Sequence, residues 1–170
     1  MARVRRPPID PIAEARRQWD AHGWTDASAG MTVVTSIMRA QQLLQARVDE
    51  ALRPHGLTFA RYELLTLLSF TRDGRMPVSS AAGRLQVHPT SVTNTVDRLE
   101  QAGLVRREPH PSDGRATLVV LTDAGRDLAR AATASLNRDV FSRPGLSPHD
   151  AEQLIGVISR LRADAGDPVV

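Results

Sequence analysis

Apolar residues return every three or four positions along most of this chain, which is the spacing of amphipathic helices. The longest such pattern covers residues 31–53 and ends before Pro54 and Gly56. Further helices are predicted over residues 12–22, 58–72, 79–85, 89–102, 123–142 and 147–163. Short strands are predicted at 76–78, 104–107 and 117–122, the last two joined by a loop rich in Pro. The pattern therefore predicts a mainly α fold with a small β-hairpin.

Two of these helices, 79–85 and 89–102, are separated by a tight break. Two helices joined in this way form the unit that places one helix in the major groove of DNA. Ser79 is the expected N-cap of the first helix. Pro89 suits the first position of the second helix, with His88 or the preceding backbone as its cap. The sequence therefore predicts a helix-turn-helix.

The second helix of this unit has two different faces. Val92, Val96 and Leu99 recur at i, i+4 and i+7 and form the expected buried stripe. The outward positions carry mostly short polar side chains: Thr90, Ser91, Thr93, Asn94, Asp97 and Arg98. Because Ser and Thr are poor helix formers, their number in the first turns favours contact with bases and phosphates. A solvated surface helix with a Ser/Thr bias is the alternative.

The predicted hairpin carries Arg115 at its tip, directly after Asp113 and Gly114. A guanidinium beside a recognition helix can reach the adjacent minor groove, whose negative potential attracts it. An ordinary solvent-exposed Arg is the alternative. Asp97 is expected to orient Arg98 or Arg115, since a carboxylate facing phosphates would repel them. The candidate DNA-contacting residues are Ser79, His88, Thr90, Ser91, Thr93, Asn94, Arg98 and Arg115.

Long amphipathic helices flank this central unit. The helix at 31–53 would be roughly 35 Å long at about 1.5 Å per residue, more than a small DNA-binding domain needs. We expect an oligomer interface there and at the C-terminal end. The predicted segments are a disordered basic arm (1–11), an extension helix and loop (12–30), a dimerisation helix (31–57), a winged helix-turn-helix DNA-binding domain (58–122) and C-terminal dimerisation helices (123–166).

Composition excludes several chemistries. The net charge is +3, and all 22 basic residues are Arg, the better residue for bidentate contacts to phosphate and guanine. A GC-rich coding bias would give the same usage. Cys is absent, which excludes disulfides, zinc thiolate sites and thiol redox sensing. No signal peptide and no bilayer-spanning apolar run is found, so we expect a cytoplasmic protein without membrane contact.

Nothing in the sequence supports an enzyme. The five His residues are scattered, and no pair has metal-ligand spacing. The chain contains neither a P-loop nor the glycine fingerprint of a dinucleotide site. We therefore expect no catalytic residues, no metal and no cofactor.

Two runs of the sequence resemble the MarR family of winged helix-turn-helix transcriptional regulators. They are SVTNTVDRLEQAGLVRR from Ser91 to Arg107 and PSDGRATLVVLTDAG from Pro111 to Gly125. The resemblance covers roughly residues 31 to 163. It implies that 89–102 is the recognition helix and that Arg115 enters the minor groove. It also implies two-fold dimers built from the N- and C-terminal helices.

The N-terminal extension is similar to that of the urate-responsive branch of this family. That branch places a Trp, an acidic residue and two Arg at a ligand pocket. Trp19 matches the Trp, Glu63 stands where the branch usually has Asp, Arg107 matches one Arg, and Thr95 stands where the other would be. The candidate ligand-lining residues are Trp19, Met38, Tyr62, Glu63 and Arg107.

The expected function is that of a dimeric repressor on a palindromic operator in double-stranded DNA. A small molecule, aromatic or anionic, would release it by favouring one spacing of the recognition helices. For Met38 and Tyr62, plain core packing is the alternative to ligand contact. A helical interaction protein of the same fold without DNA binding is the alternative for the whole chain.

Overall fold

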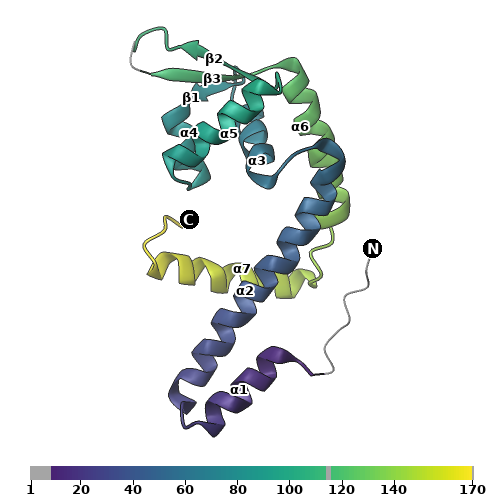
Figure 1. The fold of residues 1–170 in the computed structure, drawn as a ribbon, viewed down its shortest axis with the longest axis vertical. Helices are drawn as coiled ribbons and strands as arrows, with labels where there is room; N and C mark the ends of the chain where they lie inside the picture. The colour runs from purple at the N-terminus through teal and green to yellow at the C-terminus, as the bar shows by residue number, and fades with distance from the viewer. Residues whose placement is uncertain (1–8, 114–115, 170) are drawn as a thin grey trace. The chain divides into compact units, whose positions relative to one another are not determined.

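The structure is a computed structural model that describes residues 9–113 and 116–169. It is mostly helical with one small antiparallel sheet, which confirms the predicted fold class (Figure 1). The chain divides into two compact units, residues 1–50 and 51–170. Each unit is treated by itself below.

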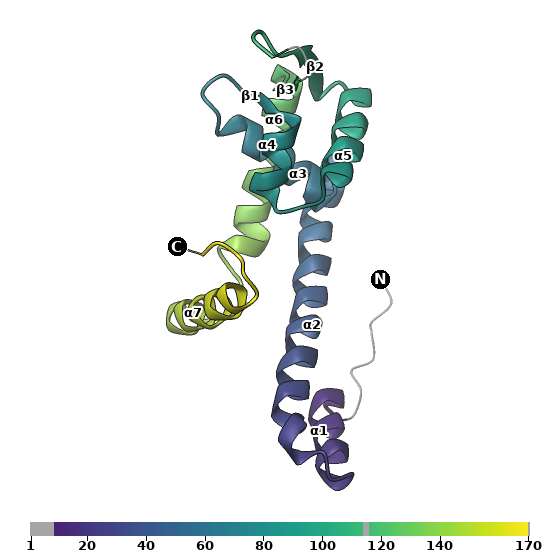
Figure 2. The ribbon, with the colours of Figure 1, turned by 90° about the vertical axis from the view of Figure 1, so that its left-hand side faces the viewer.

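The N-terminal unit consists of α1 (Pro11–Ala21) and most of α2 (Thr25–Leu52), joined by a tight turn (Figure 2). The Asp10 side chain caps α1 by accepting a hydrogen bond from the Ile12 backbone N–H at 3.0 Å. In the turn, Trp19 and Trp24 meet edge to face with ring centroids 5.2 Å apart. The two Trp residues therefore cover each other at the junction of the two helices.

The loop predicted over residues 24–30 is wrong, because α2 begins at Thr25 and continues through Gly30. A Gly inside a helix costs about 1 kcal/mol relative to Ala, which is too little to stop a helix that is favoured on both sides. The helix predicted to start at residue 31 therefore starts six residues earlier.

The second unit contains a winged helix. After the short 3-10 turn η1 (Arg53–His55) come three helices and three strands in chain order. They are α3 (Phe59–Ser69), β1 (Arg75–Pro77), α4 (Val78–Leu85), α5 (Pro89–Gln101), β2 (Val105–Pro109) and β3 (Thr117–Leu121). The sheet order is β1-β3-β2, all antiparallel, with Val105 opposite Leu121 and Met76 opposite Val119. The hairpin β2–β3 forms the wing and projects from the helices (Figure 1).

The C-terminal part of this unit starts with α6 (Asp123–Leu136), which continues into a π-helical segment, η2 (Asn137–Phe141). The last helix is α7 (Pro148–Asp164), capped by Ser147. The single helix predicted over 123–142 thus changes its hydrogen-bonding pattern after Leu136. No helix within the described ranges is long and apolar enough to cross a membrane.

The predicted helix starts are right where the cap is a local side-chain interaction. Thr58, His88 and Thr122 each accept a backbone N–H at the start of their helices, as Ser147 does. Ser79 is the exception: α4 begins one residue earlier, Pro77 occupies the N-cap, and no side chain caps it. Pro77 holds the backbone extended at φ −60° and ψ 140°, so the helix starts directly after it.

A small group of residues fixes the base of the wing against the helices. The Thr122 hydroxyl lies 2.9 Å from the Gly103 carbonyl oxygen and accepts the Gly125 N–H at 3.0 Å. A Cβ placed on Gly125 would lie only 2.1 Å from the Leu104 carbonyl oxygen. Gly125 is therefore required for the close approach of α6 to the turn between α5 and β2.

Candidate nucleic-acid interface

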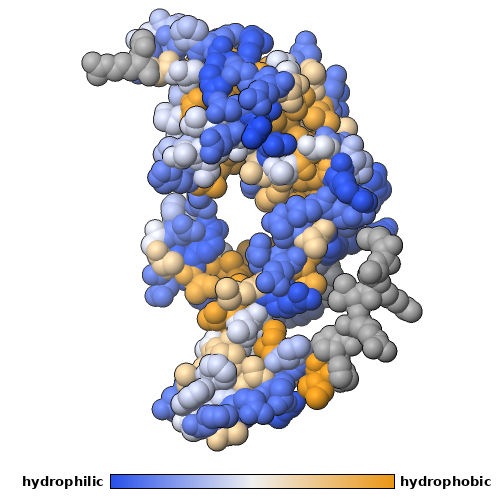
Figure 3. Space-filling view, in the orientation of Figure 1, coloured by the Kyte–Doolittle hydropathy of each residue, from blue (hydrophilic) through white to orange (hydrophobic). Residues whose placement is uncertain are grey.

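Helix α5 has the two faces that the sequence predicts. Val92, Val96 and Leu99 are at most 1% exposed and pack inward. The opposite face is exposed at Thr90, Ser91, Thr93, Asn94 and Arg98, and Figure 3 shows hydrophilic side chains over this helix. Thr and Ser hydroxyls, an amide and a guanidinium are groups that contact bases and phosphates. The exposed row on α5 is therefore a candidate DNA-reading surface.

His88 caps the start of α5 through its ring. Its Nδ1 lies 3.3 Å from the Thr90 backbone nitrogen and accepts that N–H. A nitrogen that accepts carries no hydrogen, so the ring hydrogen is on Nε2. His88 is exposed at the N-terminus of the helix, and no residue in the described ranges accepts a hydrogen bond from its Nε2. Ser79 is also exposed, in the first turn of α4.

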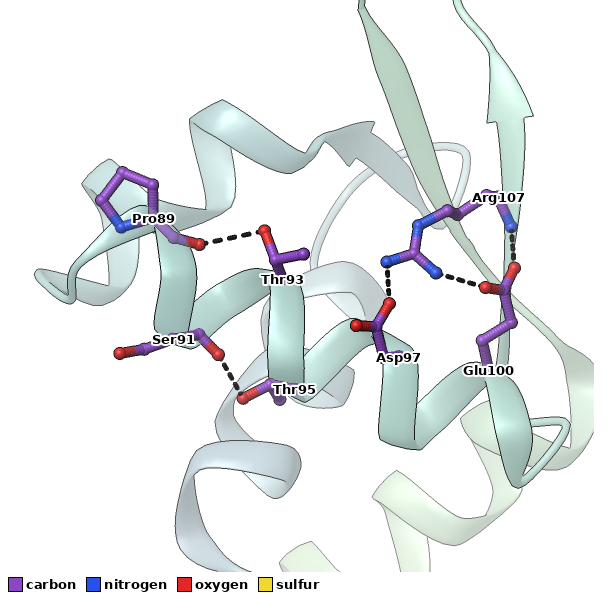
Figure 4. Close-up of polar contacts among 7 residues, drawn as sticks. All are labelled: Pro89, Ser91, Thr93, Thr95, Asp97, Glu100 and Arg107. Carbon is purple, nitrogen blue, oxygen red and sulfur yellow. Dashed lines mark hydrogen bonds and ion pairs between the residues drawn. The ribbon is translucent and has the colours of Figure 1, made fainter.

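Two Thr hydroxyls of α5 are used inside the helix. Thr93 donates to the Pro89 carbonyl at 3.2 Å and Thr95 donates to the Ser91 carbonyl at 2.8 Å (Figure 4). Such bonds to the carbonyl four residues earlier occupy the hydroxyl hydrogen. Thr93 is left with its methyl group and oxygen lone pairs for an outside partner.

Arg107 on β2 joins the wing to α5. Its guanidinium donates to the carboxylates of Asp97 and Glu100, and its backbone N–H donates to Glu100 Oε1 at 2.8 Å (Figure 4). We call these three residues the clamp. The expectation that Asp97 orients Arg98 is corrected, because Asp97 forms its ion pair with Arg107; the other expected partner, Arg115, lies outside the described residues. The sequence analysis did not predict a role for Glu100. Its position three residues after Asp97 and shortly before the Arg-containing strand β2 could have indicated one.

The clamp has an electrostatic consequence. Burial lowers the pKa of Arg107, but the hydrogen bonds to Asp97 and Glu100 outweigh it, so the pKa of Arg107 lies above its ordinary value. The Arg107 side chain is 28% exposed. It remains charged and pairs with both carboxylates of α5, so the three side chains together carry one net negative charge instead of the two that the carboxylates alone would carry.

A cavity of about 320 Å³ lies next to the clamp, between α4, α5 and the wing. It is lined by Val78, Ser79, Thr93, Arg107, Ala116 and Thr117. The lining combines an Arg with hydroxyl and apolar groups, and the space is open to solvent. Of the predicted ligand set, it contains Arg107 alone.

The other members of the predicted ligand set lie elsewhere. Tyr62 is 6% exposed, and its hydroxyl lies 3.2 Å from the Thr133 hydroxyl of α6, so it packs in the core. Glu63 is half-buried, and desolvation raises the pKa of its carboxyl group. Trp19 and Met38 belong to the N-terminal unit, where Met38 is 62% exposed. Core packing, the alternative for Met38, is therefore wrong within a single chain.

Gly114 and Arg115, which the sequence predicts at the tip of the hairpin, lie outside the described residues. The flanking backbone closes the hairpin through a hydrogen bond from the His110 N–H to the Ala116 carbonyl at 3.1 Å. Among residues 9–113 and 116–169, no group of three His, Asp or Glu side chains could hold a metal ion.

Comparisons with known proteins identify the family to which this chain belongs. The MarR family model matches residues 57–117. The crystal structure of Sco5413, a MarR family transcriptional regulator from Streptomyces coelicolor, is 46% identical, with a TM-score of 0.74 over 82% of this chain and 99% of that one. Sco3205, a MarR family regulator of the same organism solved in complex with DNA, is 30% identical, with a TM-score of 0.69 over 80% of this chain and 86% of that one.

A third relative, the transcriptional repressor MdtR of Bacillus subtilis, is 36% identical over 90 residues, 53% of this chain and 57% of that protein. This chain belongs to the MarR family, as its sequence motifs suggested. It is a transcriptional regulator of that family, a class of proteins that are not enzymes.

Proposed function

We propose that this protein is a dimeric repressor that binds a palindromic operator in double-stranded DNA and is released by a small molecule. The observation that carries the DNA-binding part is the exposed row of short polar side chains and Arg98 on α5, directly opposite the buried stripe of Val92, Val96 and Leu99. A helix buried on one face and donor-rich on the other is what major-groove readout requires. The DNA complex of Sco3205 agrees with this role.

We also propose DNA contacts for His88, Ser79 and Arg115, because of where they stand in the chain. The free Nε2–H of His88 and the Ser79 hydroxyl stand at the starts of α5 and α4, where donors suit phosphates. Arg115, at the tip of the wing, would enter the minor groove. These contacts would fix the register of the protein on the duplex, while the middle of α5 would read the bases.

Dimerisation is supported by apolar side chains that a single chain leaves open. On α2 they are Val33 (57% exposed), Val34 (56%) and Met38 (62%), and the space-filling view shows apolar areas on the flanking helices (Figure 3). On α7 they are Leu154, Ile155, Val157 and Leu161, each at least 47% exposed. Helices with open faces like these are stabilised when a second copy covers them.

Release by a small molecule is supported by the cavity beside the clamp. An anionic molecule there would compete with Asp97 and Glu100 for Arg107. Both carboxylates would then lose their partner next to the DNA-reading surface, and the wing would lose its tie to α5. The molecule would therefore bind better to the DNA-free form than to the DNA-bound form, which is the condition for release. Trp19, Met38, Tyr62 and Glu63 do not line this cavity.

The test is a titration of the protein against DNA fragments selected from a genomic pool. Arg115→Ala is expected to weaken binding and to reduce the slope of log affinity against log salt by about 1. Asn94→Ala is expected to weaken binding to the selected sequence alone. Arg130→Ala, on the exposed surface of α6, is the matched control. Parent-like binding by both test variants would refute the DNA-contact assignment, and no binding even at low salt would favour an interaction protein.

The effector is tested with an aromatic carboxylate such as benzoate as the probe. It is expected to lower operator affinity of the parent, and Arg107→Met is expected to remove that response. An unchanged response in Arg107→Met would place the effector site away from the clamp.

A further inference from the structure

We infer that the operator half-site contains an adenine read by the Asn94 side chain and a neighbouring thymine whose methyl group contacts the methyl of Thr93. This inference rests on the proposed function and adds the base identity that α5 selects. It starts from two exposed neighbours in the middle of α5. The hydroxyl of Thr93 donates a hydrogen bond inside the helix, whereas the amide of Asn94 has no partner among the described residues.

Asn94 is exposed on α5 and makes no side-chain hydrogen bond with any residue that the structure describes. It lies four residues after Thr90 and three before Asp97, so it stands in the middle of the outward row. A free carboxamide offers one acceptor and one donor side by side. In the major groove adenine presents the complementary pair, the N6 donor and the N7 acceptor. Guanine presents two acceptors, which leave the carboxamide oxygen without a partner.

Thr93 is exposed too, but its hydroxyl donates to the Pro89 carbonyl at 3.2 Å. Figure 4 shows the hydroxyl directed at Pro89 and the methyl group on another side of Cβ. The group that Thr93 offers to DNA is therefore mainly apolar. The C5-methyl of thymine is the apolar feature that a base pair displays in the major groove, and Thr methyl groups contact it.

The clamp explains why these two residues would read the bases. Asp97 lies one turn further along the outward row, but its carboxylate is paired with Arg107. The pairing holds the C-terminal half of α5 against β2. The Asp97 carboxylate is therefore occupied, while the exposed Thr93 and Asn94 side chains form no ion pair with a described residue.

The first experiment is a selection of bound duplexes from a random pool with the full-length parent, Asn94→Ala and Gln101→Ala. Gln101 supplies the matched control, because it is an exposed amide at the last position of the same helix. The parent and Gln101→Ala are expected to select one common half-site that contains an adenine. Asn94→Ala is expected to lose the preference at that adenine alone, by roughly 5- to 150-fold. Circular dichroism melting of each variant verifies that it is folded.

The second experiment changes the DNA. In the selected half-site, 7-deazaadenine removes the N7 acceptor and uracil removes the thymine methyl. The 7-deaza change is expected to weaken the parent and leave Asn94→Ala unaffected. The uracil change is expected to weaken DNA binding by the parent about fourfold, which corresponds to the burial of one methyl group. It should not change DNA binding by Thr93→Ser, since Ser keeps the hydroxyl but lacks the methyl group.

The outcomes separate this inference from the proposed function. A common half-site whose base preferences all survive in Asn94→Ala overturns the adenine assignment while DNA recognition stands. Equal uracil effects in the parent and Thr93→Ser overturn the thymine assignment in the same way. A parent that selects no sequence overturns both the inference and the proposed function.

Discussion

The winged helix and the flanking helices differ in how many of their apolar side chains are buried within one chain. Every fully buried side chain among the described residues lies between residues 52 and 136. Of residues 9–50, only Ser28 and Val48 are buried, and α7 contains no buried residue. One chain therefore forms the hydrophobic core of the winged helix, while α2 and α7 have exposed apolar side chains.

This difference separates two kinds of sequence requirement. In the winged helix, each element must fit its neighbours in the same chain, as Gly125 fits the Leu104 carbonyl. On α2 and α7, large apolar side chains are exposed, and we propose that a second copy of the chain covers them. Substitutions in the two regions should therefore fail in different ways, and the following predictions test that.

The largest effect is expected for Ile155→Asp on α7, a residue that is 59% exposed. In a two-fold dimer each change occurs twice, so the loss of two buried Ile side chains should raise the dimer dissociation constant by about 100-fold or more. Sedimentation equilibrium measures it. Gln153→Asp adds the same charge at an exposed polar position and should leave the dimer intact. If Ile155→Asp dimerises like the parent, α7 does not supply the interface.

Gly125→Ala should act within one chain. Its Cβ meets the Leu104 carbonyl oxygen at 2.1 Å, so the backbone of α6 or of the turn before β2 must move. We expect a loss of unfolding free energy of about 3 kcal/mol, measured by urea denaturation. Gly83→Ala is the matched control, since nothing lies within 4 Å of its added Cβ and helix propensity predicts a gain of up to about 1 kcal/mol. Equal effects at both glycines would contradict the packing of α6 described here.

Arg107→Met should loosen the wing without unfolding the core. Hydrogen bonds to charged groups contribute roughly 1.5–3 kcal/mol each when buried, but Asp97 is 47% exposed at its side chain, so we expect a total stability loss of about 1–2 kcal/mol. Operator affinity should fall about tenfold or more, because two carboxylates become unpaired beside the DNA. Arg106→Met, on the exposed side of the same strand, should change affinity less than about twofold. Similar losses in both variants would show that the clamp has no special role.

The smallest effect is expected at Glu63. Burial raises the pKa of this carboxyl group, so its charged form destabilises the fold at neutral pH. Glu63→Gln should raise the melting temperature at pH 7.5 by less than about 2 °C. As the pH falls through the raised pKa towards the ordinary Glu value of about 4.3, the parent becomes neutral in the native state and the difference should vanish. A difference that grows on acidification would contradict the assigned direction.

The sequence was sufficient for features that depend on neighbouring residues. The capping role of His88 and the buried stripe of α5 are confirmed because caps and helical periodicity are local. Features that depend on tertiary contact were missed. The pairing of Arg107 with Asp97 and Glu100 joins a helix to a strand, and nothing local requires it. The loop predicted to end at residue 30 is wrong, because the cost of Gly30 inside a helix is small and α2 continues through it.

The site itself was predicted only in part. The exposure of Thr90, Ser91, Thr93 and Asn94 follows from helix periodicity and is confirmed. Their contact with DNA remains a prediction, as does the role of Arg115. The predicted ligand set was divided by the fold, since Tyr62 packs against α6 while Arg107 lines the cavity beside the wing.

The most direct test of the proposed function is the stoichiometry and spacing of binding on a selected operator. Two chains should bind one duplex with half-site centres about 10–10.5 base pairs apart, or a multiple of that, because two recognition helices must enter major grooves on one face of the duplex. Hydroxyl-radical footprinting with analytical ultracentrifugation of the complex measures both quantities. One chain per duplex, or protection without a repeated half-site, would contradict the proposed two-fold repressor.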